Sequence, residues 1–222
     1  MGLLDAGNLR VKLKRIAEKG SPMCGRYDIE VDPKTLSEML GLDVPDFVAD
    51  SDFSPGNTGP VIAVGADGET RVVLMRWGLE PSWMKEKPKR PMFNARSETV
   101  AEKPMFRSAF KRKRALVPAM AFYEWTGQPG AKTKWRFSKR DGSLLVFAGL
   151  WEARDRGDGE KQLTFTILTT TPNADAEDYH DRMPVILDAA SQKHWLDPDA
   201  DPQFLLEMTT PAPDGTLTVE AA

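Results

Sequence analysis

Hydrophobic residues run together over short stretches in the second half of this chain, and turn residues separate these stretches. The stretches combine aliphatic with aromatic residues, a composition that favours strands. The predicted strands lie within ALVPAMAFYEW (115–125), KWRFSKRDGSLLVFAGLW (134–151) and QLTFTILTTTP (162–172), and the RDG turn at 140–142 joins two of them. Upstream, VIAV (61–64) and RVVLMRW (71–77) flank the turn residues GADGE, which predicts a hairpin.

Helical patterns are short and scattered by comparison. Asp32 and Pro33 form a good N-cap and first turn for a helix over 34–41, and Gly41 forms its stop. The remaining expected helices span 97–102 and 105–114, separated at Pro104, and then 174–179, 189–196 and 202–208, before a last strand at 216–220. Few long helical crossovers are available, so the strands should pair mainly as antiparallel neighbours in a strand-dominated α+β fold. A regular alternating parallel α/β fold is disfavoured.

Length and composition fit a folded chain with one main domain. The chain has 222 residues, of which 41% are hydrophobic, enough to bury a core. Residues 1–22 carry only a weak helical pattern with a net charge of +3, and we interpret them as an N-terminal extension before a domain at 23–222. No apolar run approaches the roughly 18 residues of a membrane span, and no secretory signal is recognisable, so a cytoplasmic protein is expected.

Charge is distributed unevenly along the chain. The formal net charge is −3, but residues 85–114 hold eleven Lys or Arg against three Glu, a local net charge of +8. Such a block is either a solvated helix face or a phosphate-binding face. Charge alone does not separate these two interpretations.

Cys24 is the only cysteine, so no internal disulfide can form. An ionised thiol is a strong nucleophile, although a lone cysteine is more often a small buried hydrophobe. The candidate bases are His180, between acidic residues just before a predicted strand, and His194, which fits a packed helix and is interpreted as structural. If Asp178 and Asp181 lie close to His180, they should favour its imidazolium form. With one cysteine and two histidines, a structural zinc site would need carboxylates to complete it, so neither a metal nor a cofactor is expected.

Two further segments carry polar groups in unusual settings. Glu124 lies between Tyr123 and Trp125 at the end of an apolar strand, where a partly desolvated carboxyl has a raised pKa and acts as an acid near neutrality. Strand alternation can equally point it into water. In MFNARSET, Asn94 and Arg96 are two residues apart, so in an extended segment both side chains face the same way and suit a phosphate-bearing ligand.

Six motifs in order give a more specific indication. MCGRY, RWGLEPSW, NARSET, RALVPAMAFYEW, FAGLWE and HDRMPVIL resemble the SOS response-associated peptidase (SRAP) family of abasic-site-crosslinking proteins, over essentially all of residues 23–210. The resemblance implies a single domain of mainly antiparallel, barrel-like sheet with short peripheral helices. It also implies an enzyme that captures abasic sites in single-stranded DNA through the cysteine following the initiator methionine.

The resemblance implies a role for each candidate residue. A chain-terminal cysteine is a 1,2-aminothiol: its amine forms a Schiff base with the ring-opened sugar aldehyde, and its thiol then closes a thiazolidine. Cys24 is therefore the nucleophile, Asn94 positions the reacting end, Glu124 shuttles a proton, and His180 assists at the Schiff-base stage. The implied phosphate contacts are Arg26 and Arg96. Trp83 and Trp125 are expected near the DNA path, although Trp125 can equally lie in the core. A further contact is expected from Thr169 or a neighbour.

The sequence departs from the family pattern at its start, because 22 residues precede Met23. An internal Cys24 has no free amine. Either Met23 is the true initiator, which we favour, or the extension is cleaved off by self-processing, or this member lacks crosslinking. Two other functions stay open, a cysteine hydrolase that uses Cys24 and His180, and a non-catalytic single-strand-binding module. A monomer associated with the nucleoid and slow reversal of the crosslink are further expectations.

Overall fold

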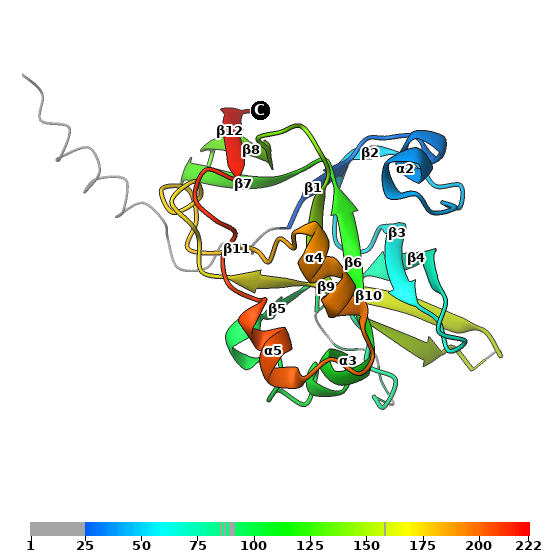
Figure 1. Ribbon diagram of the computed structural model, residues 1–222. Helices are drawn as coiled ribbons and strands as arrows, with labels where there is room; N and C mark the ends of the chain where they lie inside the picture. The colour runs from blue at the N-terminus through cyan, green and yellow to red at the C-terminus, as the bar shows by residue number, and fades with distance from the viewer. Residues whose placement is uncertain (1–24, 85, 87, 89–91, 158) are drawn as a thin grey trace, which may run out of the picture.

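Five strands close into a barrel at the centre of the molecule. The computed structural model describes residues 25–84, 86, 88, 92–157 and 159–222, so Cys24 lies outside the described residues. The barrel order is β4-β3-β6-β9-β10, and it closes because β10 pairs with both β4 and β9 (Figure 1). Its strands are β3 (Thr58–Val64), β4 (Thr70–Trp77), β6 (Arg114–Ala119), β9 (Leu145–Asp155) and β10 (Lys161–Thr170). The short strands β5 (Asn94–Arg96) and β11 (Met183–Pro184) both pair with β10.

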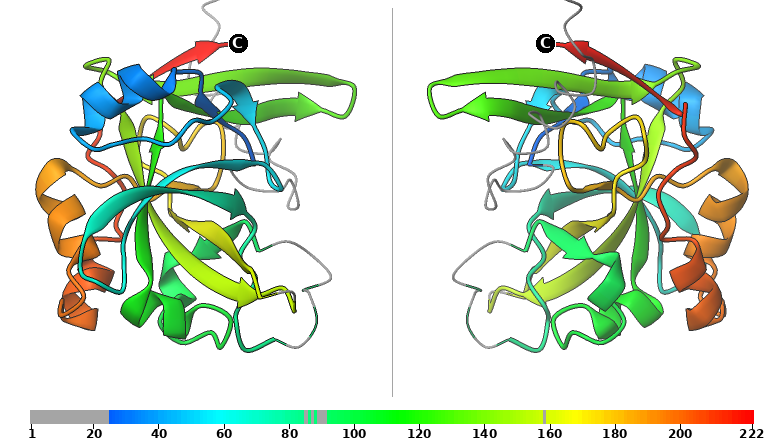
Figure 2. Two further views of the ribbon diagram at one scale, coloured as in Figure 1. Left: turned by 90° about the vertical axis from the view of Figure 1, so that its right-hand side faces the viewer. Right: turned by 90° about the vertical axis from the view of Figure 1, so that its left-hand side faces the viewer.

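A second sheet of five strands lies beside one end of the barrel, in the order β12-β8-β7-β1-β2. Its strands are β1 (Tyr27–Ile29), β2 (Asp50–Phe53), β7 (Ala121–Gln128), β8 (Ala131–Lys139) and β12 (Leu217–Ala221). The β7–β8 hairpin projects beyond the barrel (Figure 2). All strand pairings in the second sheet are antiparallel. In the barrel sheet, only β4 and β5 run parallel to β10. The α+β class with mainly antiparallel pairing is therefore confirmed.

The chain crosses from one sheet to the other at two places. At the first the sequence predicts one continuous strand, and at the second it predicts two paired strands. The stretch 115–125 is not one strand, because it leaves the barrel at Met120 and enters the second sheet as β7. The RDG turn at 140–142 does join two strands, but β8 belongs to the second sheet and β9 to the barrel, so they do not pair. Local propensity identifies strands, whereas partner choice depends on distant segments.

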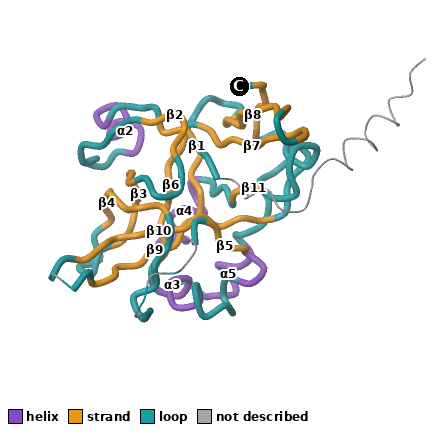
Figure 3. Tube along the Cα trace, turned by 180° about the vertical axis from the view of Figure 1, so that it is seen from behind, coloured by secondary structure: helices purple, strands orange, loops and turns teal. Residues whose placement is uncertain are grey.

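Helices are short and peripheral, as predicted, and in Figure 3 α3 and α5 lie below the barrel strands while α4 lies behind them. They are α2 (Pro33–Leu40), the 3-10 turn η1 (Ser97–Thr99), α3 (Arg107–Arg112), α4 (Ala189–Leu196) and α5 (Pro202–Glu207). The predicted cap of α2 is confirmed, since Asp32 accepts from the Thr35 backbone N–H and Gly41 ends the helix at φ 65°. The expected helices at 97–102 and 174–179 are wrong: the first is only η1, and the second is a series of hydrogen-bonded turns.

Both faces of the central barrel strand β3 are buried over most of its length. On β3, Val61 and Ala63 face a core shared with the second sheet, whereas Ile62 faces a second core that also contains Phe110 and Trp195 from α3 and α4. Because no face of such a strand meets water, its sequence reads as a continuous apolar run. No helix in the part of the chain that the structure describes has the length and hydropathy needed to span a bilayer.

Candidate functional site

Glu124 lies on the inner face of β7 and is only 3% exposed. Phe122, two residues earlier, is in the core, and the alternation of a strand turns Glu124 to the same side. Tyr123 and Trp125 therefore face the other side of the sheet. The desolvated setting expected for Glu124 is confirmed, and the alternative in which it points into water is excluded.

His180 reaches Glu124 from a loop that follows β10. Its Nε2 lies 3.9 Å from Oε2 of Glu124. The preceding residue, Tyr179, anchors the loop because its ring packs edge-on against Trp135 at 4.9 Å and Phe137 at 5.3 Å, both on β8. Residues 56 positions apart in sequence thus share one buried place.

The protonation state of His180 is set by burial and by a backbone donor. The Arg182 backbone N–H donates to Nδ1 of His180 at 3.1 Å, so a neutral ring carries its proton on Nε2, toward Glu124. Burial lowers the pKa of His180 below its ordinary value, although Asp181, 3.2 Å from Nδ1, acts in the opposite direction. Asp181 does favour the imidazolium form, as expected of a close carboxylate, but it is largely exposed to water, and desolvation of the ring outweighs it.

The buried neutral His180 should make folding stability depend on pH. The unfolded chain binds a proton near pH 6.5, and the folded chain binds it at lower pH, so stability is complete above about 6.5 and falls as the solution is acidified. We expect the urea concentration at the unfolding midpoint to decrease when the pH is lowered from 7.5 to 5.5. The decrease should be smaller in His180→Gln. Equal losses in both proteins would contradict a neutral buried ring.

Arg182 connects this pair to the neighbouring strands, and sequence reasoning overlooked it. Its guanidinium donates to both carboxylate oxygens of Glu98, which holds the pKa of that carboxyl below its usual value, and to the Thr169 carbonyl at 2.6 Å. Its backbone N–H orients His180 at the same time. Arg182 is visible in the motif HDRMPVIL as its basic residue, but the sequence does not show which carboxylate pairs with it.

Removing the Arg182 side chain should destabilise the fold. The side chain is 9% exposed and joins the His180 loop to β10 and to η1, so its charged hydrogen bonds are poorly replaced by water. We expect Arg182→Ala to lower the free energy of unfolding by about 1.5–3 kcal/mol. The matched control is Arg71→Ala, which breaks an exposed pair with Asp67 and should cost less than about 1 kcal/mol. Urea denaturation measures both, and equal losses would contradict a linking role.

Asn94, Arg96 and Thr169 are brought together on a second pair of strands. In the parallel β5–β10 pairing, Asn94 is opposite Ile167 and Arg96 is opposite Thr169. Arg96 is exposed, as a phosphate contact requires, whereas the Thr169 side chain is fully buried and its hydroxyl has no hydrogen-bond partner within the described residues. The neighbouring Thr171 is exposed.

The predicted aromatic contacts lie in two different places. Trp83 is 57% exposed in the loop after β4, which is anchored by Glu80 through ion pairs to Arg76 and Arg154. The same loop returns through a bridge between Leu79 and Met92, directly before β5. Trp125 is half-buried on the outer face of β7, not in either core cluster.

The basic block divides when it folds. Arg114 is 5% exposed and donates to main-chain carbonyls that include those of Phe110 and Trp195, so it belongs to the fold and not to a phosphate-binding face. Lys113 is paired with the buried Glu152 at 2.5 Å. Arg96, Lys103, Arg107, Lys111 and Arg112 are exposed, while Lys85, Lys87, Lys89 and Arg90 lie outside the described residues.

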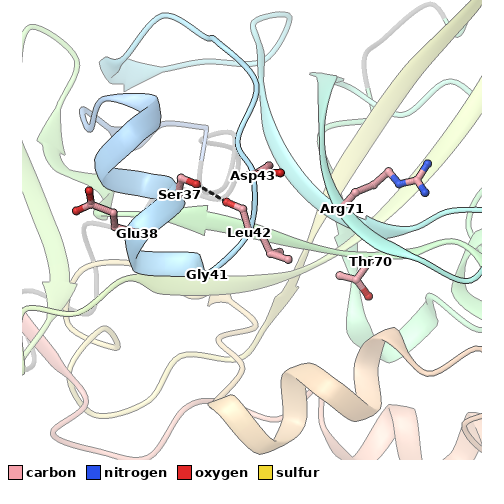
Figure 4. A pocket seen from close by; sticks show the side chains of 7 residues that line it. All are labelled: Ser37, Glu38, Gly41, Leu42, Asp43, Thr70 and Arg71. Carbon is pink, nitrogen blue, oxygen red and sulfur yellow. Dashed lines mark hydrogen bonds between the residues drawn. The ribbon is translucent and has the colours of Figure 1, made fainter.

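Two hollows within the described residues hold none of the predicted site residues. One of about 430 Å³ lies between the end of α2 and the β3–β4 hairpin, where Ser37 donates to the Leu42 carbonyl and Arg71 points outward (Figure 4). No group of three His, Cys, Asp or Glu side chains within the described ranges is arranged to hold a metal ion.

Comparison with known proteins identifies the family. The family model described as "SOS response associated peptidase (SRAP)" matches residues 23–221. The chain belongs to the SRAP family. The match begins at Met23 and leaves out the first 22 residues.

Relatives of this SRAP protein carry names that refer to abasic sites. "Abasic site processing protein YoqW" of Bacillus subtilis is 39% identical over 197 residues, which cover 85% of this chain and 87% of that protein. "Abasic site processing protein HMCES" of Rattus norvegicus is 33% identical and aligns with 65% of this chain and 52% of its own length.

Solved structures share the SRAP fold. A protein from Bacteroides thetaiotaomicron superposes with a TM-score of 0.80 at 22% identity, over 89% of this chain and 91% of its own. A protein from Bordetella bronchiseptica gives 0.77 at 28% identity, over 90% of this chain and 99% of its own.

Proposed function

We propose that this protein captures abasic sites in single-stranded DNA by forming a thiazolidine with Cys24, after residues 1–23 are removed or when synthesis starts at Met23. The observation that carries the proposal is the buried pair of Glu124 and His180, whose Oε2 and Nε2 atoms are 3.9 Å apart. The Tyr123 backbone N–H, next to Glu124, donates to the carbonyl of Arg26, two residues after Cys24. The pair is therefore held beside the strand that follows the cysteine.

The reaction needs proton transfers that such a pair supplies. The α-amine of Cys24 adds to the C1 aldehyde of the opened sugar, and the carbinolamine loses water to give an imine. The thiol then adds to the imine carbon, and its proton moves to nitrogen. A buried carboxyl can protonate the sugar as it opens, and the neutral imidazole beside it can relay protons. Both groups are largely shielded from bulk water.

DNA binding draws on residues around this pair. Exposed Arg96 and the partly exposed Arg26 supply phosphate contacts, and exposed Trp83 supplies a stacking surface for a base. In this proposal Asn94, at the start of β5, orients the sugar. Reversal of the crosslink would use Glu124 again.

The hydrolase alternative asks more of His180 than its surroundings favour. To take a proton from a thiol, the ring needs a free acceptor nitrogen, and in the neutral ring Nδ1 already accepts from the Arg182 backbone N–H. The alternative predicts amide turnover on peptides without dependence on DNA, which is measured directly.

Three measurements on the same protein separate the three functions. Protein beginning at Cys24 is incubated with a single-stranded oligonucleotide bearing one abasic site, and the products are run on a denaturing gel. A shifted band supports the proposal. Binding in a native gel without a shifted band supports a non-catalytic module, and peptide turnover without either supports the hydrolase.

A further inference from the structure

The outer face of the second sheet carries cations and aromatic rings that the proposed reaction does not use. In the β7–β8 pairing, Tyr123 is opposite Arg136 and Trp125 is opposite Lys134. Opposite residues of an antiparallel pair share one face, so these four side chains lie together on the side away from Glu124.

Two of the cations on this face converge on one carboxylate. The Lys134 Nζ lies 3.0 Å from Oδ1 of Asp52, and the Arg26 Nε lies 3.3 Å from Oδ2 of the same group. The Lys134 ammonium also makes cation–π contacts, since its Nζ is 3.9 Å from the ring centroid of Tyr123 and 5.8 Å from that of Trp125. The Lys134 ammonium thus has a defined place even when its carboxylate partner leaves.

We propose that Arg26 and Lys134 form a binding site for one phosphodiester of the DNA strand, and that Asp52 occupies this site as an internal counter-ion when DNA is absent. A carboxylate and a phosphodiester each offer two oxygens and one negative charge, so both suit the same pair of cations. This inference rests on the proposed function, because it assigns a contact to the strand that carries the lesion.

Asp52 is suited to leave when a phosphate arrives. Its side chain is 54% exposed, so it can turn into water without a cost of burial. Exposed ion pairs contribute little to stability. A phosphodiester within a DNA strand lies next to further negative charges that also attract the protein, so it competes well with Asp52 for the two cations.

The neighbouring Arg136 shows the opposite arrangement. It is paired with Asp28 at 3.2 Å and with Glu220 at 3.2 Å, so two carboxylates neutralise one cation. At the other end of the face, two cations share one carboxylate. The excess positive charge on this face therefore lies at Arg26 and Lys134, next to the strand that carries Glu124.

Replacing Asp52 by Asn tests whether the carboxylate competes with DNA. Binding of the full chain to a single-stranded oligonucleotide without an abasic site is followed by fluorescence anisotropy at several salt concentrations. We expect Asp52→Asn to bind about two- to five-fold more tightly than the unaltered chain at low salt. The control is Asp67→Asn, which makes the same change of charge in the exposed pair with Arg71 and should change binding less.

Replacing Lys134 by Gln tests the site from the other side. Loss of one phosphate contact should reduce the slope of log K against log salt by about 0.7, whereas Lys139→Gln, at the far end of β8, should leave it unchanged. Equal effects of Asp52→Asn and Asp67→Asn, or an unchanged slope in Lys134→Gln, overturn this site alone. Failure of the unaltered chain to bind DNA overturns the proposed function and the site together.

Discussion

Protein that begins at Cys24 is expected to give a shifted band with abasic single-stranded DNA, and the 222-residue chain with Met1 retained is expected to give none. The reason is chemical: Cys24 inside a chain has an amide nitrogen, which does not condense with an aldehyde. The free α-amine has a reference pKa of about 7.7–8.0, so part of it is neutral and nucleophilic near pH 7.5. Denaturing gels measure the band, and intact mass identifies the first residue of each protein.

The matched control keeps the amine and removes the thiol. A protein that begins at residue 24 with Cys24→Ala should still form an imine that borohydride traps, but no stable band without borohydride. This separates the amine step from the thiol step. A stable band from the long chain, with Met1 still present by mass, would show that the amine of Cys24 is not required.

Glu124→Gln should slow crosslink formation on the order of 10²-fold while DNA affinity changes little, because general acid–base groups contribute about 10²–10⁴. The substitution preserves the shape of the side chain on β7 and removes only its ability to release and take up a proton. Single-turnover time courses on denaturing gels measure the rate, and anisotropy with unmodified DNA measures affinity.

A second buried glutamate supplies the comparison. Glu152 is 2% exposed on β9 and pairs with Lys113. Glu152→Gln should lower stability without changing the crosslinking rate. If Glu124→Gln instead loses affinity or folded protein as its main effect, Glu124 has a structural role.

The sequence predicted local features well where one short segment decides them. Asp32 and Gly41 specify the ends of α2 through a side-chain acceptor and a left-handed φ, both of which need only neighbouring residues. Apolar runs identified the strands around 115–125 and 162–172 for the same reason. The motif order indicated the family, and the family match from Met23 to residue 221 confirms it.

Features that depend on contacts between distant segments could not be predicted in this way. The exit of the chain from the barrel at Met120 has no local signal, because both flanking strands are apolar and only their partners differ. The effect of Asp181 on the His180 pKa was predicted with the right sign, but the burial that outweighs it is not visible in the sequence.

By itself, the sequence determined the residue types at the site, the family, and the question of whether Cys24 acquires a free amine. Only the tertiary structure decided that Glu124 faces inward, that His180 lies 3.9 Å from it, and that Arg182 joins the loop to β10. It also decided that Arg26 and Lys134 share Asp52. The physical reason is that charge and burial act through space, and the arrangement of the sheets brings together side chains far apart in the chain, such as Arg26 and Lys134, which are 108 positions apart.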